Sequence, residues 1–126
     1  MIFYVAGSLD KGNELKKIIQ TLEDLGHTIS FDWTVGPILK PYDKDIALTQ
    51  DFAQKALNGA RACDIFLLFP DQTGGTGQFV ELGAALFSER VTHVFVIGPH
   101  QGRSLMFFHP RVKRADSLEE ALASIA

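Results

Sequence analysis

The chain has 126 residues, with a hydrophobic fraction of 46% and a charged fraction of 21%, which are typical of one globular domain with room for a sheet and covering helices. A net charge of −3 offers no basic surface, so a polynucleotide partner is not expected. The lone cysteine excludes an intramolecular disulfide framework, and the apolar N-terminal run is too short for a signal peptide or a membrane span. The sequence therefore predicts a single cytoplasmic domain, residues 1–126, without membrane attachment.

The first half of the chain alternates two strand patterns with two helix patterns. A short apolar run ends at Gly7, and the leucines and isoleucines after it recur at helical spacing until Gly26, which suits a left-handed helix terminus. A second strand alternates apolar and polar residues, and a loop with two prolines leads into a second helix, whose stripe from Leu48 to Ala60 we expect to be buried. The predicted elements are a strand at 2–6, a helix at 13–25, a strand ending near 32–33, a loop at 34–45 and a helix at 46–62.

The second half continues the alternation. A continuous apolar run that ends at Pro70 is typical of a central parallel strand buried on both faces, and a glycine-rich turn follows it. Ser117 and Glu120 match the capping box that opens a last helix. The predicted elements are a strand at 64–69, a helix at 78–90, a strand at 91–97, a loop at 98–110, a short edge strand at 111–115 and a helix that ends at the C-terminus.

Strands that alternate with helices predict a three-layer α/β fold with a parallel sheet and right-handed crossovers. Five strands favour the flavodoxin-like (Rossmann-like) order 2-1-3-4-5. In that order the loops after the first and third strands diverge and leave a crevice at the switch point. These loops are residues 7–12 and 70–77, so the topology places Tyr4, Ser8 and Glu81 around one cleft.

Glu81 closely follows Gly74, Gly75 and Gly77 in the turn after the third strand. Such a turn lets a ligand approach the backbone closely, and we expect it to deliver Glu81 into the first turn of a helix, an arrangement suited to chemistry on a sugar or phosphate. The alternative is a carboxylate that only interacts with the helix dipole. Because the glycine turn and the Gly7-Ser8 loop converge, the sequence favours a functional Glu81.

Tyr4, Asp32 and Trp33 lie on the two predicted strands beside the crevice. Tyr4 takes part in the site if its hydroxyl reaches Glu81, and is otherwise a strand aromatic. Trp33 can stack on a base and Asp32 can accept from an amino group or hydroxyl, although strand-end packing and turn formation explain them equally well. The four histidines and one cysteine lack metal-ligand spacing, and no Lys-Ser/Thr pair follows the glycines, so we expect no metal, no cofactor and no hydrolysis of nucleoside triphosphates.

Four short motifs are spread over nearly the whole chain: Tyr4-Val5-Ala6-Gly7-Ser8, Phe31-Asp32-Trp33-Thr34, Ala62-Cys63-Asp64-Ile65, and Gly77 with Glu81-Leu82-Gly83-Ala84-Ala85. Together they resemble the nucleoside 2-deoxyribosyltransferase family, which is similar in turn to the 2'-deoxynucleoside 5'-monophosphate N-hydrolases. The resemblance implies that Glu81 attacks the anomeric carbon of a deoxyribosyl group, displaces the base and forms a covalent intermediate, with Tyr4 orienting the carboxylate. A second base as acceptor then gives transfer, and water gives hydrolysis.

The resemblance also implies the ligands and the assembly. The substrates would be a small nucleoside or nucleotide and a free base. The loop at 98–109 is similar to a family loop that enters the neighbouring subunit's site, which would place Arg103, Phe107 and His109 in a partner's pocket and make the protein a homodimer or larger homo-oligomer. The alternative is a surface loop anchored by Phe107 and Phe108. The substrate-binding residues implied within one subunit are Gly7, Ser8, Asp32, Trp33, Gly75 and Gly77.

The chain departs from the family pattern near the leaving base and the sugar. Ala56 occupies the position of a family aspartate that handles the base, so Asp32 or Asp51 would have to replace it. Gly75 stands where the transferases can place a carboxylate and the hydrolases a serine. The hydrolases' arginine in the first loop is also absent, which leaves only Ser8, Lys11 and backbone amides to hold a 5'-phosphate.

Two other interpretations stay open. The run from Gly74 to Gly77 followed by Glu81 is also similar to phosphoribohydrolases with a Pro-Gly-Gly-x-Gly-Thr-x-x-Glu motif, although Thr73 replaces the motif's proline and Gln78 its threonine. The second interpretation is a non-catalytic nucleotide-binding module, which is favoured by the alanine at position 56 in place of the family aspartate. Base release from a ribonucleoside monophosphate would select the first, and binding without base release the second.

Overall fold

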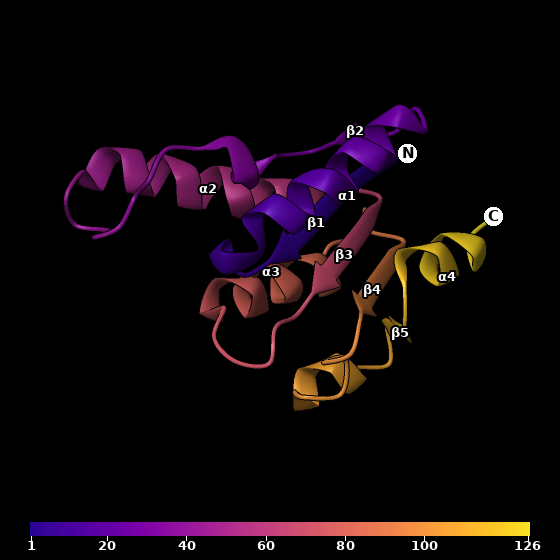
Figure 1. The fold of residues 1–126 in the computed structure, drawn as a ribbon. Helices are drawn as coiled ribbons and strands as arrows, with labels where there is room; N and C mark the ends of the chain where they lie inside the picture. Colours follow the sequence, from indigo (N-terminus) through magenta and orange to yellow (C-terminus); the bar gives the residue numbers. More distant parts are fainter.

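The computed structural model describes residues 1–126 as one parallel sheet covered by helices (Figure 1). The strands are β1 (Ile2–Gly7), β2 (Thr28–Ile29), β3 (Ile65–Phe69), β4 (His93–Ile97) and β5 (Val112–Ala115). Their order in the sheet is β2-β1-β3-β4-β5, and all neighbours are parallel. The predicted three-layer α/β fold with the order 2-1-3-4-5 is therefore confirmed.

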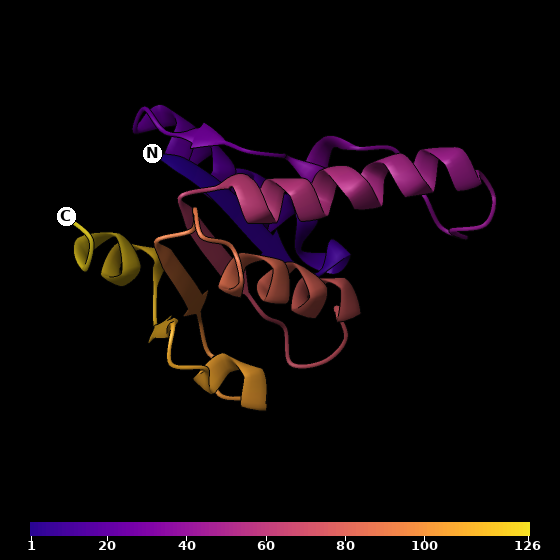
Figure 2. The same cartoon turned by 180° about the vertical axis from the view of Figure 1, so that it is seen from behind.

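The helices form the two outer layers. They are α1 (Gly12–Asp24), α2 (Ile46–Ala62), α3 (Thr76–Leu86) and α4 (Leu118–Ala123), with short 3-10 turns η1 (Leu9–Lys11), η2 (Trp33–Val35) and η3 (Leu105–Phe108). Helices α1 and α4 cover one face of the sheet and α2 and α3 the other, as the opposite views of Figures 1 and 2 show. Because both faces of β3 and β4 are covered, their apolar residues are almost completely buried.

Strands β1 and β3 end at the same level, because Gly7 lies opposite Phe69 in the register. A Cβ atom at Gly7 would lie 2.6 Å from Leu15 Cδ1 and 3.2 Å from the Phe69 carbonyl oxygen. A larger residue at this position would therefore have to displace Leu15 of α1 and crowd the Phe69 carbonyl. The pairing of β1 with β3 places the loops that follow these strands side by side.

The second strand is shorter than predicted, because it ends at Ile29 rather than near Trp33. Ser30 still donates its N–H to the Phe3 carbonyl at 2.9 Å, and the chain then leaves the sheet. The indole Nε1 of Trp33 donates to the Val5 carbonyl at 2.6 Å. A side chain thus satisfies the carbonyl that a longer strand would have paired, and the apolar alternation that predicted a strand reflects this anchoring of Trp33.

Replacing Trp33 with Phe is expected to lower the free energy of unfolding by about 1–3 kcal/mol, because the Val5 carbonyl would be buried without a donor. Urea denaturation followed by circular dichroism measures this loss, since the chain has a single tryptophan and loses its fluorescence probe. An unchanged denaturation midpoint would contradict the role of the indole in closing the edge of β1.

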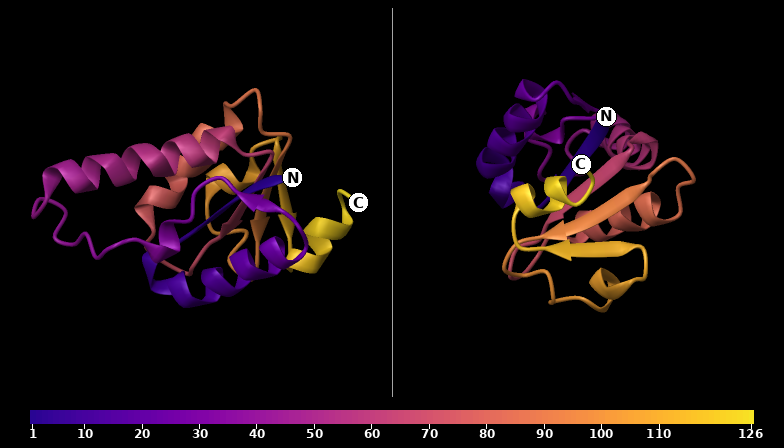
Figure 3. Two further views of the ribbon diagram at one scale, coloured as in Figure 1. Left: turned by 90° about the horizontal axis from the view of Figure 1, so that it is seen from above. Right: turned by 90° about the vertical axis from the view of Figure 1, so that its right-hand side faces the viewer.

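Helix α2 has its predicted bounds, but most of its apolar stripe is not buried. Leu48 and Leu57 are 39% and 36% exposed, and Gly59 and Ala60 are the buried residues of the helix. Figure 3 shows why: the N-terminal half of α2 and the loop before it project beyond the sheet. None of the helices is both long and apolar enough to cross a membrane.

Two other helix boundaries differ from the predictions. Helix α3 begins at Thr76 and ends at Leu86 rather than at Arg90, because Ser88 turns away and donates its hydroxyl to the Arg61 carbonyl at 2.6 Å. The last helix begins with the predicted cap, in which Ser117 accepts from the Glu120 N–H, but it ends before the C-terminus.

Candidate active site

A cleft of about 620 Å³ opens at the carboxyl ends of β1 and β3. It lies between the loops that diverge after these two strands, at the switch point where open α/β sheets bind ligands. The loop that follows η2 and the projecting part of α2 form its outer wall. Seven of the residues predicted for the site line this cleft, namely Tyr4, Gly7, Ser8, Trp33, Gly75, Gly77 and Glu81.

The Tyr4 hydroxyl donates a short hydrogen bond to Glu81 Oε2. Tyr4 is completely buried in β1, and its ring stacks on Phe66 with centroids 5.7 Å apart. Gly59 of α2 leaves space for that ring, since a Cβ atom there would lie 3.1 Å from it. Packing on both sides thus fixes Tyr4, which in turn fixes one oxygen of Glu81.

The second oxygen of Glu81, Oε1, has no hydrogen-bond partner and faces Gly77. A Cβ atom at Gly77 would lie 4.0 Å from this oxygen, so glycine keeps the space around it open. Glu81 is the sixth residue of α3 and so lies in the second turn of the helix, not in the first as predicted. The free oxygen therefore faces the cleft rather than capping the helix.

Burial dominates the electrostatics of this pair. It raises the pKa of Glu81 from 4.5 to about 7, while the hydrogen bond from Tyr4 acts in the opposite direction and lowers it. Burial, followed by the nearby Glu81 charge, raises the pKa of Tyr4 far above its ordinary value, so Tyr4 stays a donor. Near pH 7 the Glu81 carboxyl group is therefore divided between its two protonation states.

Replacing Tyr4 with Phe is expected to lower kcat/KM at pH 7 by about 10- to 100-fold, because a hydrogen bond to a charged group contributes about 1.5–3 kcal/mol. Any wild-type activity that needs ionised Glu81 is expected to rise with pH through about 7. Loss of the Tyr4 hydroxyl removes an interaction that lowers the Glu81 pKa, so the acidic limb moves to higher pH. A pH profile of kcat/KM measures both effects, and an unmoved limb would contradict them.

The turn before α3 takes a conformation that favours glycine. Gly74 and Gly75 have φ values of 76° and 70°, and a Cβ atom at Gly75 would lie 2.6 Å from Gln78 Nε2. The Gly74 carbonyl accepts from Gln78 Nε2 at 3.3 Å and from an Arg103 guanidinium nitrogen at 2.8 Å. The guanidinium of Arg103 also lies 5.4 Å from the centre of the Phe79 ring. The loop before β5 therefore holds the glycine turn within the same subunit.

Asp71 connects the loop after β3 with the loop after β1. Its carboxylate accepts from Ser8 Oγ at 2.6 Å and forms an ion pair with Lys11 Nζ at 3.2 Å. Lys11 also donates to the Pro70 carbonyl at 3.3 Å. The hydrogen bond from Ser8 is the largest cause that lowers the Asp71 pKa, so Asp71 is ionised at neutral pH.

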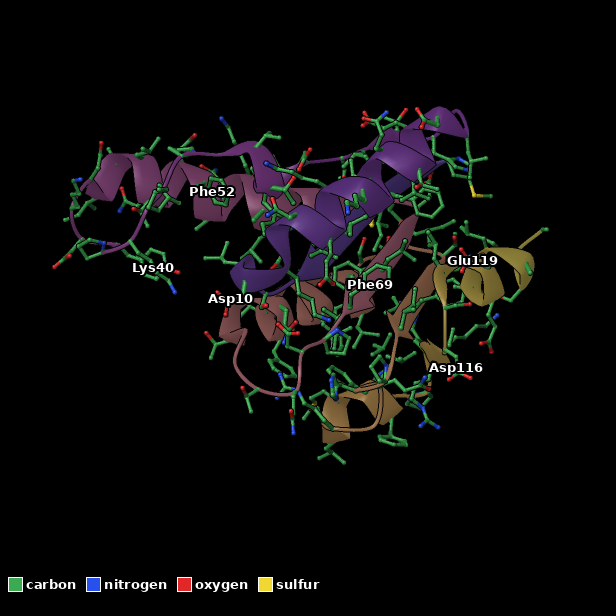
Figure 4. The ribbon with its side chains drawn as sticks, in the orientation of Figure 1. Asp10, Lys40, Phe52, Phe69, Asp116 and Glu119 are labelled. Atoms are coloured by element: carbon green, nitrogen blue, oxygen red, sulfur yellow. The ribbon has the colours of Figure 1, made fainter.

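The outer wall is mostly apolar, with charge confined to its rim. Phe52 lies on the part of the lining contributed by α2, where Ala56 leaves no group for proton transfer. Lys40, on the loop before α2, and Asp10, in η1, both belong to the lining and come from different elements (Figure 4). The remaining lining of this wall is formed by Thr34, Gly36, Pro37, Ile38, Leu39, Tyr42, Thr49 and Ala53.

Three of the predicted substrate-binding residues do not line the cleft of their own subunit. Asp32 accepts from the backbone N–H of Thr34 and caps η2. Arg103 contacts the glycine turn from outside, and His109 Nδ1 accepts from the Arg111 N–H. Asp51, suggested to replace the family aspartate, forms an exposed ion pair with Lys55 and is also outside the cleft.

Sequence reasoning missed Asp71 and Gln78, which contact the predicted residues directly. Asp71 follows Pro70 at the carboxyl end of β3, and ligands of open α/β sheets bind at this end of the strands beside the switch point. The position of Asp71 in the sequence could therefore have identified it as a candidate. Gln78 resembles an ordinary helix residue in the sequence, and only its burial with Oε1 unpaired distinguishes it. No group of three or more His, Cys, Asp or Glu side chains lies together as a metal site would require.

The fold and the cleft define a Rossmann-like α/β protein with a partly buried carboxylate at the carboxyl edge of its sheet. No family model matches the chain, and no curated protein matches it significantly. Among solved structures the chain is similar to a CMP N-glycosidase from Clostridium botulinum, BcmB. The TM-score is 0.58 at 16% sequence identity, and the alignment covers 99% of this chain and 98% of that chain. At this identity the likeness shows a common fold over the full length of both chains.

Proposed function

We propose that this protein cleaves the N-glycosidic bond of a 2'-deoxynucleoside, or of its 5'-monophosphate, through a covalent intermediate on Glu81. The hydrogen bond between Tyr4 and Glu81 carries the proposal, because it fixes one carboxylate oxygen and leaves Oε1 open to the cleft. The resemblance of the motifs to the deoxyribosyltransferases and the full-length likeness to an N-glycosidase support the same reaction class.

The first chemical step breaks one bond and forms another at the anomeric carbon. Glu81 Oε1 attacks this carbon as an oxocarbenium-like transition state develops, and the electron pair of the C–N bond leaves with the base. Tyr4 keeps its proton and, through its hydrogen bond, stabilises Glu81 in the ionised form that makes the attack. Water or a second base then attacks the same carbon and releases Glu81, which gives hydrolysis or transfer respectively.

The lining divides the cleft into a sugar end and a base end. Glu81, Ser8 and the glycine turn surround the inner end, which suits a polar sugar. The wall that includes Trp33 and Phe52 is apolar and suits the faces of a base. Because Ala56 contributes no proton donor there, the departing base takes its proton from water.

The test incubates the protein with each deoxynucleoside and each deoxynucleoside monophosphate, with and without a second free base, and separates the products. Base release or base exchange is expected, and intact mass spectrometry after acid quenching should detect protein carrying one deoxyribosyl group. Ribonucleoside monophosphates form a parallel arm that selects the phosphoribohydrolase alternative if only they react. Binding without product in any arm would leave a non-catalytic module and refute the proposed reaction.

The protein is also expected to work as a homodimer or larger homo-oligomer. Leu105, Met106 and Phe108 in and around η3 are 80%, 54% and 52% exposed, which leaves apolar side chains in water beside Arg103 and His109. Sedimentation or light scattering should give at least twice the mass of 13.9 kDa. Leu105→Asp is expected to dissociate the assembly, whereas Leu25→Asp, an equal change at an exposed site at the end of α1, is not; a monomeric wild type would refute the expectation.

A further inference from the structure

At the inner end of the cleft, the Ser8 hydroxyl is available to a ligand only as a hydrogen-bond acceptor, so this end favours a ligand group that donates. Ser8 is 7% exposed and lines the cleft, and its hydroxyl donates to Asp71 at 2.6 Å. A hydroxyl has one proton and two lone pairs, so a Ser8 hydroxyl committed to Asp71 can only accept from a ligand. Asp71 cannot reverse this direction, because an ionised carboxylate has no proton to donate.

The charge balance of the same region disfavours an anion. Lys11 is the cation nearest to Ser8 in the chain, but its Nζ is paired with Asp71 at 3.2 Å and also donates to the Pro70 carbonyl. The charged side chains on the cleft lining are Glu81, Asp10 and Lys40. Lys40 lies on the loop before α2, whereas Asp10 lies in η1 (Figure 4). A dianionic phosphate beside Ser8 would therefore find Lys11 already paired, and Asp71 would place a negative charge one hydrogen bond beyond the Ser8 hydroxyl.

We propose that Ser8 and Asp71 form a receptor for a free sugar hydroxyl, which makes the substrate a nucleoside and excludes its 5'-monophosphate. The inference rests on the proposed function and specifies its substrate. The 5'-hydroxyl of the nucleoside donates a hydrogen bond to Ser8 Oγ. The Ser8 hydroxyl in turn donates its own hydrogen bond to Asp71. Thr76 and Gly77, the first residues of α3, also line the cleft, and their backbone N–H groups have no partner within the helix and can donate to the oxygen of the same hydroxyl.

Asp71 is the specificity-determining residue in this arrangement, although it contacts the ligand only through Ser8. Replacement by Asn removes one negative charge, frees Lys11 and lets the Ser8 hydroxyl turn its proton toward the cleft. All three changes favour phosphate oxygens over a hydroxyl. Ser8→Ala removes the acceptor and leaves the Asp71 charge in place, so it should weaken binding of the nucleoside without favouring the monophosphate.

The test measures binding by isothermal titration calorimetry in the Glu81→Gln background, so that turnover does not interfere. A deoxynucleoside that the wild type cleaves and its 5'-monophosphate are titrated in parallel; if the wild type cleaves neither, the four common deoxynucleosides are used. We expect the deoxynucleoside to bind more tightly, and Asp71→Asn to shift the ratio of affinities toward the monophosphate by about tenfold or more. Ser8→Ala should lower deoxynucleoside affinity by about tenfold.

Asp24→Asn is the matched control, because it removes the same charge at the far end of α1, about 20 Å of helix away from Gly12 at the cleft. It should leave the ratio unchanged, and thermal denaturation verifies that each variant is folded. Tighter binding of the monophosphate by the parent protein, an unmoved ratio in Asp71→Asn, or no binding of either ligand overturns the inference. Base release by the wild type is measured separately. Cleavage of monophosphates would agree with the proposed function but would contradict this inference.

Discussion

Replacing Glu81 with Gln is expected to lower the rate of base release by at least about 10⁴-fold, because the amide cannot form the glycosyl-enzyme bond. The substitution preserves the shape of the side chain and an acceptor for Tyr4, so substrate binding should be retained. Product formation under single-turnover conditions measures the rate, and calorimetry measures the binding. The adduct seen by mass spectrometry should disappear together with the activity.

Glu119→Gln is the matched control for this prediction. Glu119 is exposed in the first turn of α4, on the side of the molecule opposite the cleft opening (Figure 4). Its replacement makes the same chemical change without touching the cleft and should leave the rate unchanged. Retention of more than about a tenth of the wild-type rate in Glu81→Gln would show that the carboxylate is not the nucleophile.

Most of the fold could be predicted from the sequence because its signals are local. Continuous apolar runs, prolines and a capping box marked three of the strands and the last helix, and the alternation of elements then fixed the sheet order. The edge strand β2 could not be predicted correctly, because the bond from the Trp33 indole to the Val5 carbonyl joins residues 28 positions apart. A local alternation of apolar residues does not distinguish a strand from a side chain anchored in this way.

The candidate site was predictable where topology alone determines it. The strand order and register bring Tyr4 to Glu81, although 77 positions separate them. The protonation of Glu81 was not predictable, because it depends on how completely its neighbours exclude water. The pairing of Ser8 with Asp71 likewise needs side-chain positions in two loops, which no periodic pattern specifies.

The same carboxylate is expected to make the protein less stable as the pH rises from about 5 to about 7. Burial raises the pKa of Glu81 in the folded state to about 7, above its ordinary value of 4.5. Between these values the folded protein binds a proton that the unfolded chain has released, so the free energy of unfolding falls with rising pH. The contribution is fully present below about 4.5 and is lost above about 7, and its size is up to about 3 kcal/mol.

Glu81→Gln should remove this pH dependence, because the amide stays neutral at every pH. At pH 8 the variant is expected to be more stable than the wild type by up to about 3 kcal/mol, or about 10 °C in Tm, while at pH 4.5 the two should unfold alike. Urea denaturation at both pH values measures the difference, with Glu119→Gln as the exposed control. A stability gap of equal size at both pH values would contradict the raised pKa. A gap that opens only above pH 5 would mean that the fold loses stability in order to keep an ionised carboxylate in the cleft, as expected for a side chain retained for reaction rather than for packing.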